Sequence, residues 1–268
     1  MQTPQTTRNR YSVFTILALT ALLTGCEIAS TTSPGSSADT SPGQAGSMAR
    51  FALTGDYLYT VDRYRLKTFD VSDAANPQSP NGKEQYMDFG IETIFPLDSL
   101  LFLGSQTGMY IYSITRPDFP RMLGYVSHIT ACDPVVASGN YAYVTLNSES
   151  IHCGRSVNEL HVYELSDLQN PRLVHTESAL KHPKGLGVDQ NRLFVCDNGL
   201  KVYDVTNPAQ PLLMDDISDI PETSGAESYD VIPIDGLLLL ISDKGLYQFD
   251  YTGRKLSFVS KLPVSPNK

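Results

Sequence analysis

The stretch NRLFVCDNGLKVYDVTNPAQP, from Asn191 to Pro211, contains the pattern that decides the fold. An apolar run leads to Asn198-Gly199, and an alternating run and a polar loop that ends in proline come next. Asn-Gly between two such runs is typical of a tight β-hairpin, because both residues tolerate positive φ. The stretch therefore predicts two antiparallel strands and a closing loop.

The same unit occurs five times in the chain. Its opening residues are Tyr57, Leu100, Tyr141, Arg192 and Leu237, at spacings of 43, 41, 51 and 45 residues. A period of this length is typical of stacked units or propeller blades. Each unit contains the two strands described above, a weaker strand after the loop, and a short strand before the opening residue. Four strands per unit predict an all-β fold, most simply a β-propeller of five four-stranded blades over residues 48–268.

The strands that start at the opening residues are almost continuously apolar, as in Leu100–Leu103 and Leu237–Leu240. Continuous apolarity predicts that these strands are buried on both faces. The next strands alternate, as in Leu200–Val205, and are expected to present one face to the interior. The fifth unit loses the repeat pattern after Asp250.

The N-terminus resembles a bacterial lipoprotein signal. Arg8 and Arg10 precede an apolar run that ends in Leu23-Thr24-Gly25-Cys26, which is similar to the lipobox. By that resemblance, residues 1–25 are a signal peptide, and Cys26 becomes the acylated first residue. We therefore expect a lipid-anchored protein of the bacterial outer membrane, either periplasmic or exposed at the surface. The alternative is an ordinary signal peptide with a cysteine there by chance.

Residues 26–47 contain the acylated cysteine followed by a Ser, Thr, Pro and Gly-rich stretch, which predicts a flexible linker.

Composition limits the class of partner. The net charge of −9, or −11 after loss of the two signal-peptide arginines, argues against nucleic acid as a partner. The simplest explanation of this negative charge is that it keeps the protein soluble. No apolar run after residue 26 approaches the ~20 residues of a membrane helix.

Residues 50 to about 260 resemble the LVIVD repeat. The resemblance rests on the pattern Gly-Leu-x-Val-Tyr-Asp-Val-Ser/Thr-Asn-Pro-x-x-Pro and on the stretches Thr130–Val136, Gly185–Val188 and Phe194–Asp197. The three stretches look especially like LVIVD lipoproteins of the Bacteroidetes type, and the resemblance implies a β-propeller at the cell envelope. The family has no assigned activity, so the resemblance transfers no catalytic residue and implies no cofactor.

Two cysteines in the third unit are expected to lie on one rim of the propeller. Cys132 enters the innermost strand, and Cys153 belongs to the loop between the second and third strands. That loop is ten residues longer than in the first unit and also contains Glu149 and His152. In an oxidising compartment the two thiols predict a disulfide. The alternative is a metal site that adds His152 and His128, although the short Cys-x₂-Cys spacing of structural zinc is absent.

Charged residues recur near the start of each innermost strand. Seven or eight residues before the opening positions lie Arg50, Glu92, Asp133, Lys184 and Asp230. In a propeller these positions surround the mouth of the central channel, on the rim that carries Glu149 and His152. Together they form the candidate binding rim, which is either a polar pocket for a small ligand or peptide terminus, or a self-compensating ring of charges.

The remaining motifs are weak. An acidic cluster at residues 215–222 lacks the ligand order and central glycine of a calcium loop, and no metal site is predicted. There is no Gly-x-Ser-x-Gly elbow, Walker loop or dinucleotide fingerprint.

We expect a monomeric, non-catalytic propeller that binds a protein, peptide or glycan. The alternatives are a hydrolase or lyase whose acid and base come from Glu92, Asp133 and Asp230, and a purely structural envelope protein.

Overall fold

The computed structural model describes residues 46–80, 84–87, 90–127, 134–147, 157–218 and 225–264. These residues belong to one compact unit, Thr40–Lys268. They form five four-stranded antiparallel sheets, and each sheet is one repeat unit with its strands in sequence order. Within these ranges, no helix is long and apolar enough to cross a membrane.

The first three blades contain the strands β1 to β12. Blade 1 consists of β1 (Phe51–Thr54), β2 (Tyr57–Asp62), β3 (Arg65–Asp70) and β4 (Gln85–Tyr86). Blade 2 consists of β5 (Ile91–Leu97), β6 (Leu100–Ser105), β7 (Gly108–Ser113) and β8 (Arg121–Ser127). Blade 3 consists of β9 (Val135–Ser138), β10 (Tyr141–Leu146), β11 (Glu159–Glu164) and β12 (Arg172–Glu177).

The last two blades contain the strands β13 to β20. Blade 4 consists of β13 (Pro183–Asp189), β14 (Arg192–Asp197), β15 (Leu200–Asp204) and β16 (Leu212–Ile217). Blade 5 consists of β17 (Ser228–Ile234), β18 (Leu237–Ser242), β19 (Gly245–Asp250) and β20 (Ser257–Pro263). Although the sequence pattern fades after Asp250, β20 is a full outer strand, whereas β4 of blade 1 has only two residues.

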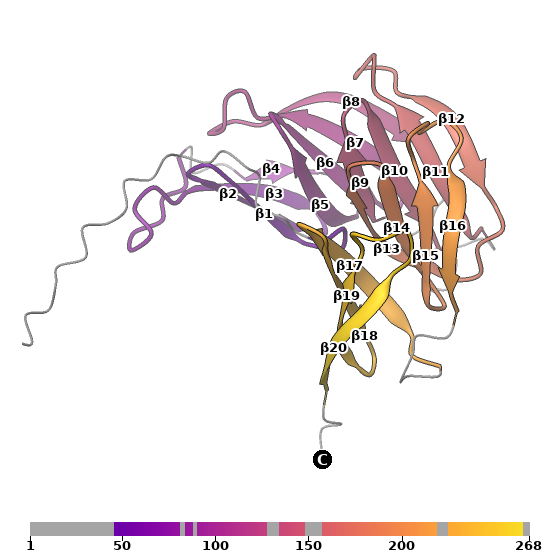
Figure 1. Ribbon diagram of the computed structural model, residues 1–268. Coiled ribbons are helices and arrows are strands. Elements are labelled where there is room, and N and C mark those ends of the chain that lie inside the picture. The colour runs from indigo at the N-terminus through magenta and orange to yellow at the C-terminus, as the bar shows by residue number, and fades with distance from the viewer. Residues whose placement is uncertain are drawn as a thin grey trace, which may run out of the picture. The chain divides into compact units, whose positions relative to one another are not determined.

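The innermost strands β1, β5, β9, β13 and β17 contact one another in succession (Figure 1). The fold is a five-bladed β-propeller, as the repeat predicted. Blade 5 is linked to the start of blade 1 by the segment before β1, where Ser47 Oγ donates a hydrogen bond to Asp230 Oδ1 at 2.9 Å.

Turn residues of the repeat take the predicted roles. Asn198 and Gly199 both have positive φ, 48° and 128°, and join β14 to β15 as a tight hairpin. In the loop that follows the third strand, the repeated acid binds its own backbone: Asp204 Oδ1 accepts a hydrogen bond from Thr206 N at 2.8 Å. The same contact links Asp70 to Ser72 and Asp250 to Thr252. Hydrogen bonds from these hydroxyl and amide groups lower the pKa of each aspartate.

The core consists of four apolar clusters, one between each pair of successive blades. The third residue of each second strand is aromatic in blades 1 to 4, and all four side chains are fully buried against the next blade: Tyr59, Phe102, Tyr143 and Phe194. Such rings bury a large area and dominate the packing energy. Blade-to-blade contact therefore supplies most of the hydrophobic stabilisation.

Burial of the second strands on both faces is confirmed only in the three middle blades. After its first residue, every side chain of β6, β10 and β14 is buried. The prediction is wrong for β2 and β18, in which buried residues alternate with residues that are partly buried or, at Ile241, exposed. The reason is that blades 1 and 5 each pack against only one neighbour among the described clusters.

Candidate functional site

A cavity of about 280 Å³ lies at the mouth of the propeller, where the innermost strands begin. All five blades contribute to its wall, which is mostly apolar. The described residues that line it are Met48, Arg50, Glu92, Thr93, Pro134, Asn147, Pro183, Lys184 and Tyr229. A pocket of this size accommodates a small molecule or one or two residues of a peptide.

Three charged side chains line this cavity, and they differ in their polar partners. Glu92 Oε1 accepts a hydrogen bond from Gln106 Nε2 at 2.9 Å. Lys184 is ion-paired with Glu227, and its Nζ lies 4.8 Å from the ring centre of Tyr229. Arg50 is exposed and forms no side-chain hydrogen bond or ion pair with any described residue. Among the described residues that line the cavity, Arg50 is therefore the charged side chain without a polar partner.

A short segment, Gly46–Met48, ties the mouth to the inner strands of blades 4 and 5. Ser47 is completely buried, accepts a hydrogen bond from Leu186 N at 2.8 Å and donates one to Asp230 Oδ1 at 2.9 Å. Met48 N donates to Asp230 Oδ2 at 3.3 Å. Burial raises the pKa of Asp230, and these hydrogen bonds oppose the shift. Asp230 thus holds the segment that carries Met48 to the cavity wall.

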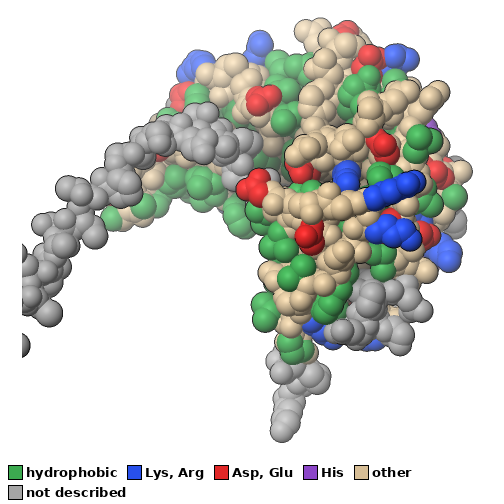
Figure 2. Space-filling model, viewed as in Figure 1, with side chains coloured by type: hydrophobic (Ala, Val, Ile, Leu, Met, Phe, Trp, Pro, Cys, Tyr) green, Lys and Arg blue, Asp and Glu red, His purple; other side chains and the backbone are tan. Residues whose placement is uncertain are grey.

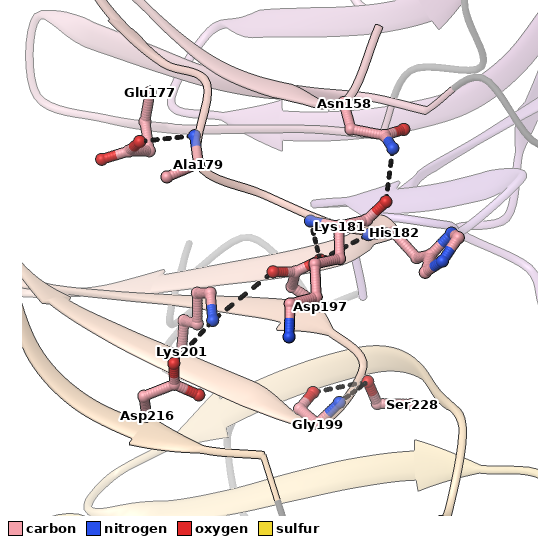
Figure 3. Close-up of polar contacts among 10 residues, drawn as sticks. All are labelled: Asn158, Glu177, Ala179, Lys181, His182, Asp197, Gly199, Lys201, Asp216 and Ser228. Atoms are coloured by element: carbon pink, nitrogen blue, oxygen red, sulfur yellow. Dashed lines mark hydrogen bonds and ion pairs between the residues drawn. The ribbon is translucent and has the colours of Figure 1, made fainter. Parts of the chain in front are cut away.

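A buried polar network sets the path of the chain into β13 and so to Lys184 (Figure 3). Asp197 Oδ1 accepts hydrogen bonds from the backbone amides of Lys181 and His182, at 2.8 and 2.5 Å. Asp197 Oδ2 lies 3.5 Å from Lys201 Nζ, which also binds Asp216 at 2.8 Å. Because the buried carboxylate of Asp197 binds two backbone amides, it fixes residues 181 and 182, directly before Pro183 and Lys184 of the cavity wall.

The structure brings together only part of the candidate binding rim. Arg50, Glu92 and Lys184 line one cavity. Asp230 is buried, and its carboxylate is engaged by Ser47 and Met48 instead of facing that cavity. Its neighbour Tyr229 lines the wall in its place. Asp133, Glu149, His152, Cys132, Cys153 and Cys26 lie outside the described residues, and so does the sequence-predicted disulfide.

Sequence reasoning missed the apolar part of the wall and the segment behind it. Ser47 and Met48 precede the first strand, and composition alone places Ser47 at the end of the linker and Met48 at the start of the propeller. In the fifth unit the counted position falls on Tyr229 or Asp230, and it is Tyr229 that lines the cavity. The bulge between Ser228 and Asp230 shifts the pairing of β17 with β18, which residue counting cannot detect.

The carboxylates expected at the mouth are described only in part, since Asp133 lies outside the described residues. Among the described residues that line the cavity, Glu92 is the one carboxylate. The described part of the site therefore does not provide the pair of carboxylates that a hydrolase or lyase of the predicted kind would use. An apolar wall with one unpaired guanidinium suits an anionic group attached to an apolar body.

Comparison with known families identifies the repeat. The model of the LVIVD repeat matches residues 45–88, 130–151 and 185–219, which fall on units 1, 3 and 4. Units 1, 3 and 4 are therefore similar to the LVIVD repeat. Blades 2 and 5 have the same four-stranded form as these blades, although the family model does not match them. None of the curated protein sequences matches this chain.

Solved structures with a similar fold come from several bacteria. A functionally unknown protein from Desulfotomaculum acetoxidans is 12% identical, with a TM-score of 0.60 over 83% of this chain and 71% of that chain. The periplasmic gluconolactonase PpgL of Pseudomonas aeruginosa is 14% identical, with a TM-score of 0.57 over 78% of this chain and 68% of that chain. Apo AztD from Citrobacter koseri is 12% identical, with a TM-score of 0.52 over 74% and 57%. This chain thus spans little more than half of AztD, and at these identities the likeness shows the fold alone.

Proposed function

We propose that this protein is a lipid-anchored, non-catalytic binding propeller of the bacterial cell envelope. The lipobox-like sequence at Cys26 supports the anchor, and the linker that follows would hold the propeller away from the lipid surface. The mouth cavity is the binding site in this proposal. The observation that carries it is the exposed Arg50, which has no described polar partner at the edge of an apolar cavity built by all five blades.

The preferred ligand is a peptide that ends in an apolar residue with a free carboxylate. Arg50 would receive the carboxylate, because a guanidinium binds a carboxylate through two parallel hydrogen bonds. Met48, Pro134 and Tyr229 would pack against the terminal side chain. Lys184 already has a partner in Glu227, so it contributes to the local field more than to direct pairing.

Titration with a short peptide tests this proposal. The probe is acetyl-Ala-Ala-Leu with a free carboxylate, compared with the same peptide as its C-terminal amide, and binding is measured by isothermal titration calorimetry. We expect Arg50→Gln to weaken binding of the acid at least about tenfold, because a charge-assisted hydrogen bond contributes roughly 1.5–3 kcal/mol. The amide should bind wild type and Arg50→Gln equally weakly.

Arg254→Gln is the matched control, since Arg254 is also an exposed arginine without a described side-chain partner but does not line the mouth cavity. It should bind the acid like wild type. Equal affinity for the acid and the amide, or equal loss in both arginine variants, would remove the mouth as a carboxylate site. Absence of any heat with the acid would do the same for this ligand class.

A further inference from the structure

The outer side of blade 5 is an apolar surface that no described element covers. On this side Ile241 pairs with Leu246, and Leu246 pairs with Leu262, so the three side chains share one face of the sheet. Ile241 is 40% exposed and Leu262 is 61% exposed. The other side of the same blade packs fully against blade 4. We call the exposed side the downstream face, because it points to where a next blade would follow.

The outer side of blade 1 is exposed in the same way. Phe51 and Leu53 alternate with the buried Ala52 along β1, and Leu53 pairs with Leu58 on β2. Phe51 is 60% exposed, and neither Phe51 nor Leu53 belongs to any described core cluster. This is the upstream face of blade 1, the side that in blades 2 to 5 packs on the preceding blade. Figure 2 shows hydrophobic side chains on both sides of the hollow between these two blades.

The repeat shows what these two faces are built to contact. At the third position of the second strand, blades 1 to 4 bury an aromatic side chain of their downstream face in the upstream face of the next blade. The same position in blade 5 is Leu239, which is only partly buried and belongs to no described cluster. The natural complement of the free downstream face is therefore a blade's upstream face. Among the described blades, blade 1 alone has that face free.

Within one chain, the segment before β1 lies along the inner edge of the downstream face. Gly46 packs so closely on β17 that an added Cβ would lie 2.2 Å from Asp230 Oδ2 and 3.3 Å from Ile232 Cγ1. Ser47 and Met48 are hydrogen-bonded to the same strand. Within the described ranges, the segment thus joins the two apolar faces at the axis alone, and farther out Phe51, Ile241 and Leu262 remain exposed.

We infer that the downstream face of blade 5 docks on the upstream face of blade 1 of a second copy of this chain. The contact repeats between copies the packing that each chain makes four times within itself. It is a head-to-tail contact, so it either closes into a ring of copies or continues as a linear assembly. This inference does not rest on the mouth site, and it replaces the monomeric domain expected from the sequence with a self-associating one.

Cross-linking of two variants that each gain one cysteine tests the inference. Full-length Phe51→Cys and full-length Ile241→Cys are purified in detergent, mixed, and treated with a short bismaleimide, with the wild-type chain as the background for its native cysteines. We expect the mixture to yield a dimer band that neither variant gives alone and that increases with protein concentration. In the mixture, Leu262→Lys on the Ile241→Cys chain should lower the yield about tenfold, because the lysine would be desolvated in an apolar contact.

Leu212→Lys is the matched control, since Leu212 is 66% exposed on the outer strand of blade 4 and lies away from both faces. It should leave the dimer band unchanged. Three results would each overturn the inference. They are a dimer from Ile241→Cys alone that equals the mixture, a cross-link within the single chain of a Phe51→Cys/Ile241→Cys double variant at every dilution, and no cross-link above the wild-type background.

Discussion

At the scale of single residues, the contacts of Ser47 decide how the mouth is held. Its hydroxyl accepts from Leu186 N and donates to Asp230 Oδ1, so one buried side chain joins the N-terminal segment to blades 4 and 5. Burial disfavours the ionised form of Asp230 and raises its pKa, and the hydroxyl of Ser47 is the first of the groups that oppose this. The hydroxyl therefore stabilises a charge that the fold has removed from water.

Replacing Ser47 with alanine should lower the free energy of unfolding by about 1–3 kcal/mol, because it leaves the buried amide of Leu186 without its partner and removes one of the two hydrogen bonds to Asp230 Oδ1. The variant should raise the pKa of Asp230 further. A group whose pKa is raised in the folded state stabilises the fold at low pH, and this stabilisation disappears as pH rises through that pKa. The loss in unfolding free energy caused by Ser47→Ala should therefore be larger at pH 7 than at pH 3. Chemical denaturation at both pH values measures this.

Ser99→Ala is the control for that measurement, since Ser99 is exposed in the turn between β5 and β6 and has no described side-chain hydrogen bond. Its effect should stay within about 0.5 kcal/mol at both pH values. An equally small effect of Ser47→Ala would mean that the segment before β1 is not held by this hydroxyl.

At the scale of secondary-structure elements, the packing of β13 on β17 depends on glycine. An added Cβ at Gly187 would lie 2.6 Å from Pro233 Cδ and 2.9 Å from Val231 O, closer than real contacts allow. Because the proline ring and the backbone cannot move independently, Gly187→Ala must push the two strands apart. We expect a loss of about 1–3 kcal/mol in the free energy of unfolding, as for other overpacked cores.

Gly253→Ala provides the comparison for Gly187→Ala, because an added Cβ there meets its nearest atom, Lys255 O, at an ordinary 3.6 Å. Thermal unfolding of the two variants under one condition separates strand packing from a general effect of removing glycine. Similar melting temperatures for both would show that β13 and β17 can separate without cost.

The sequence predicted the strands and the hairpin turn, but it did not predict which strand faces are covered or which residues line the cavity. Period-two alternation and the Asn198-Gly199 turn depend on neighbouring residues, so strand positions and the hairpin could be found from them. Whether an apolar strand such as β18 is covered on its second face depends on a neighbouring blade, which the strand's own residues do not encode. The cavity wall at Tyr229 depended on a bulge in β17, and the burial of Ser47 depended on contacts with residues more than a hundred positions away.

At the scale of the whole molecule, two proposals are coupled. If Cys26 is lipidated, the chain is confined to a membrane surface, and confinement raises the local concentration of any weak self-contact. The free faces of blades 1 and 5 would then meet more often than they do in solution. Anchoring and head-to-tail association can therefore be tested in one experiment, with two readouts that are independent of each other.

Cys26→Ser should move the protein from the membrane fraction to the soluble fraction of the cells, because two or three buried acyl chains, at about 0.8 kcal/mol per CH₂, are what hold it there. In cells that co-express the Phe51→Cys and Ile241→Cys chains, the same substitution in both should reduce the cross-linked dimer. Ser36→Ala in the linker should change neither readout. Retention of Cys26→Ser in the membrane fraction would refute lipidation whatever the dimer yield. Release with an undiminished dimer would show instead that the blade faces associate without help from the membrane, since their apolar contact would then be strong enough at solution concentrations.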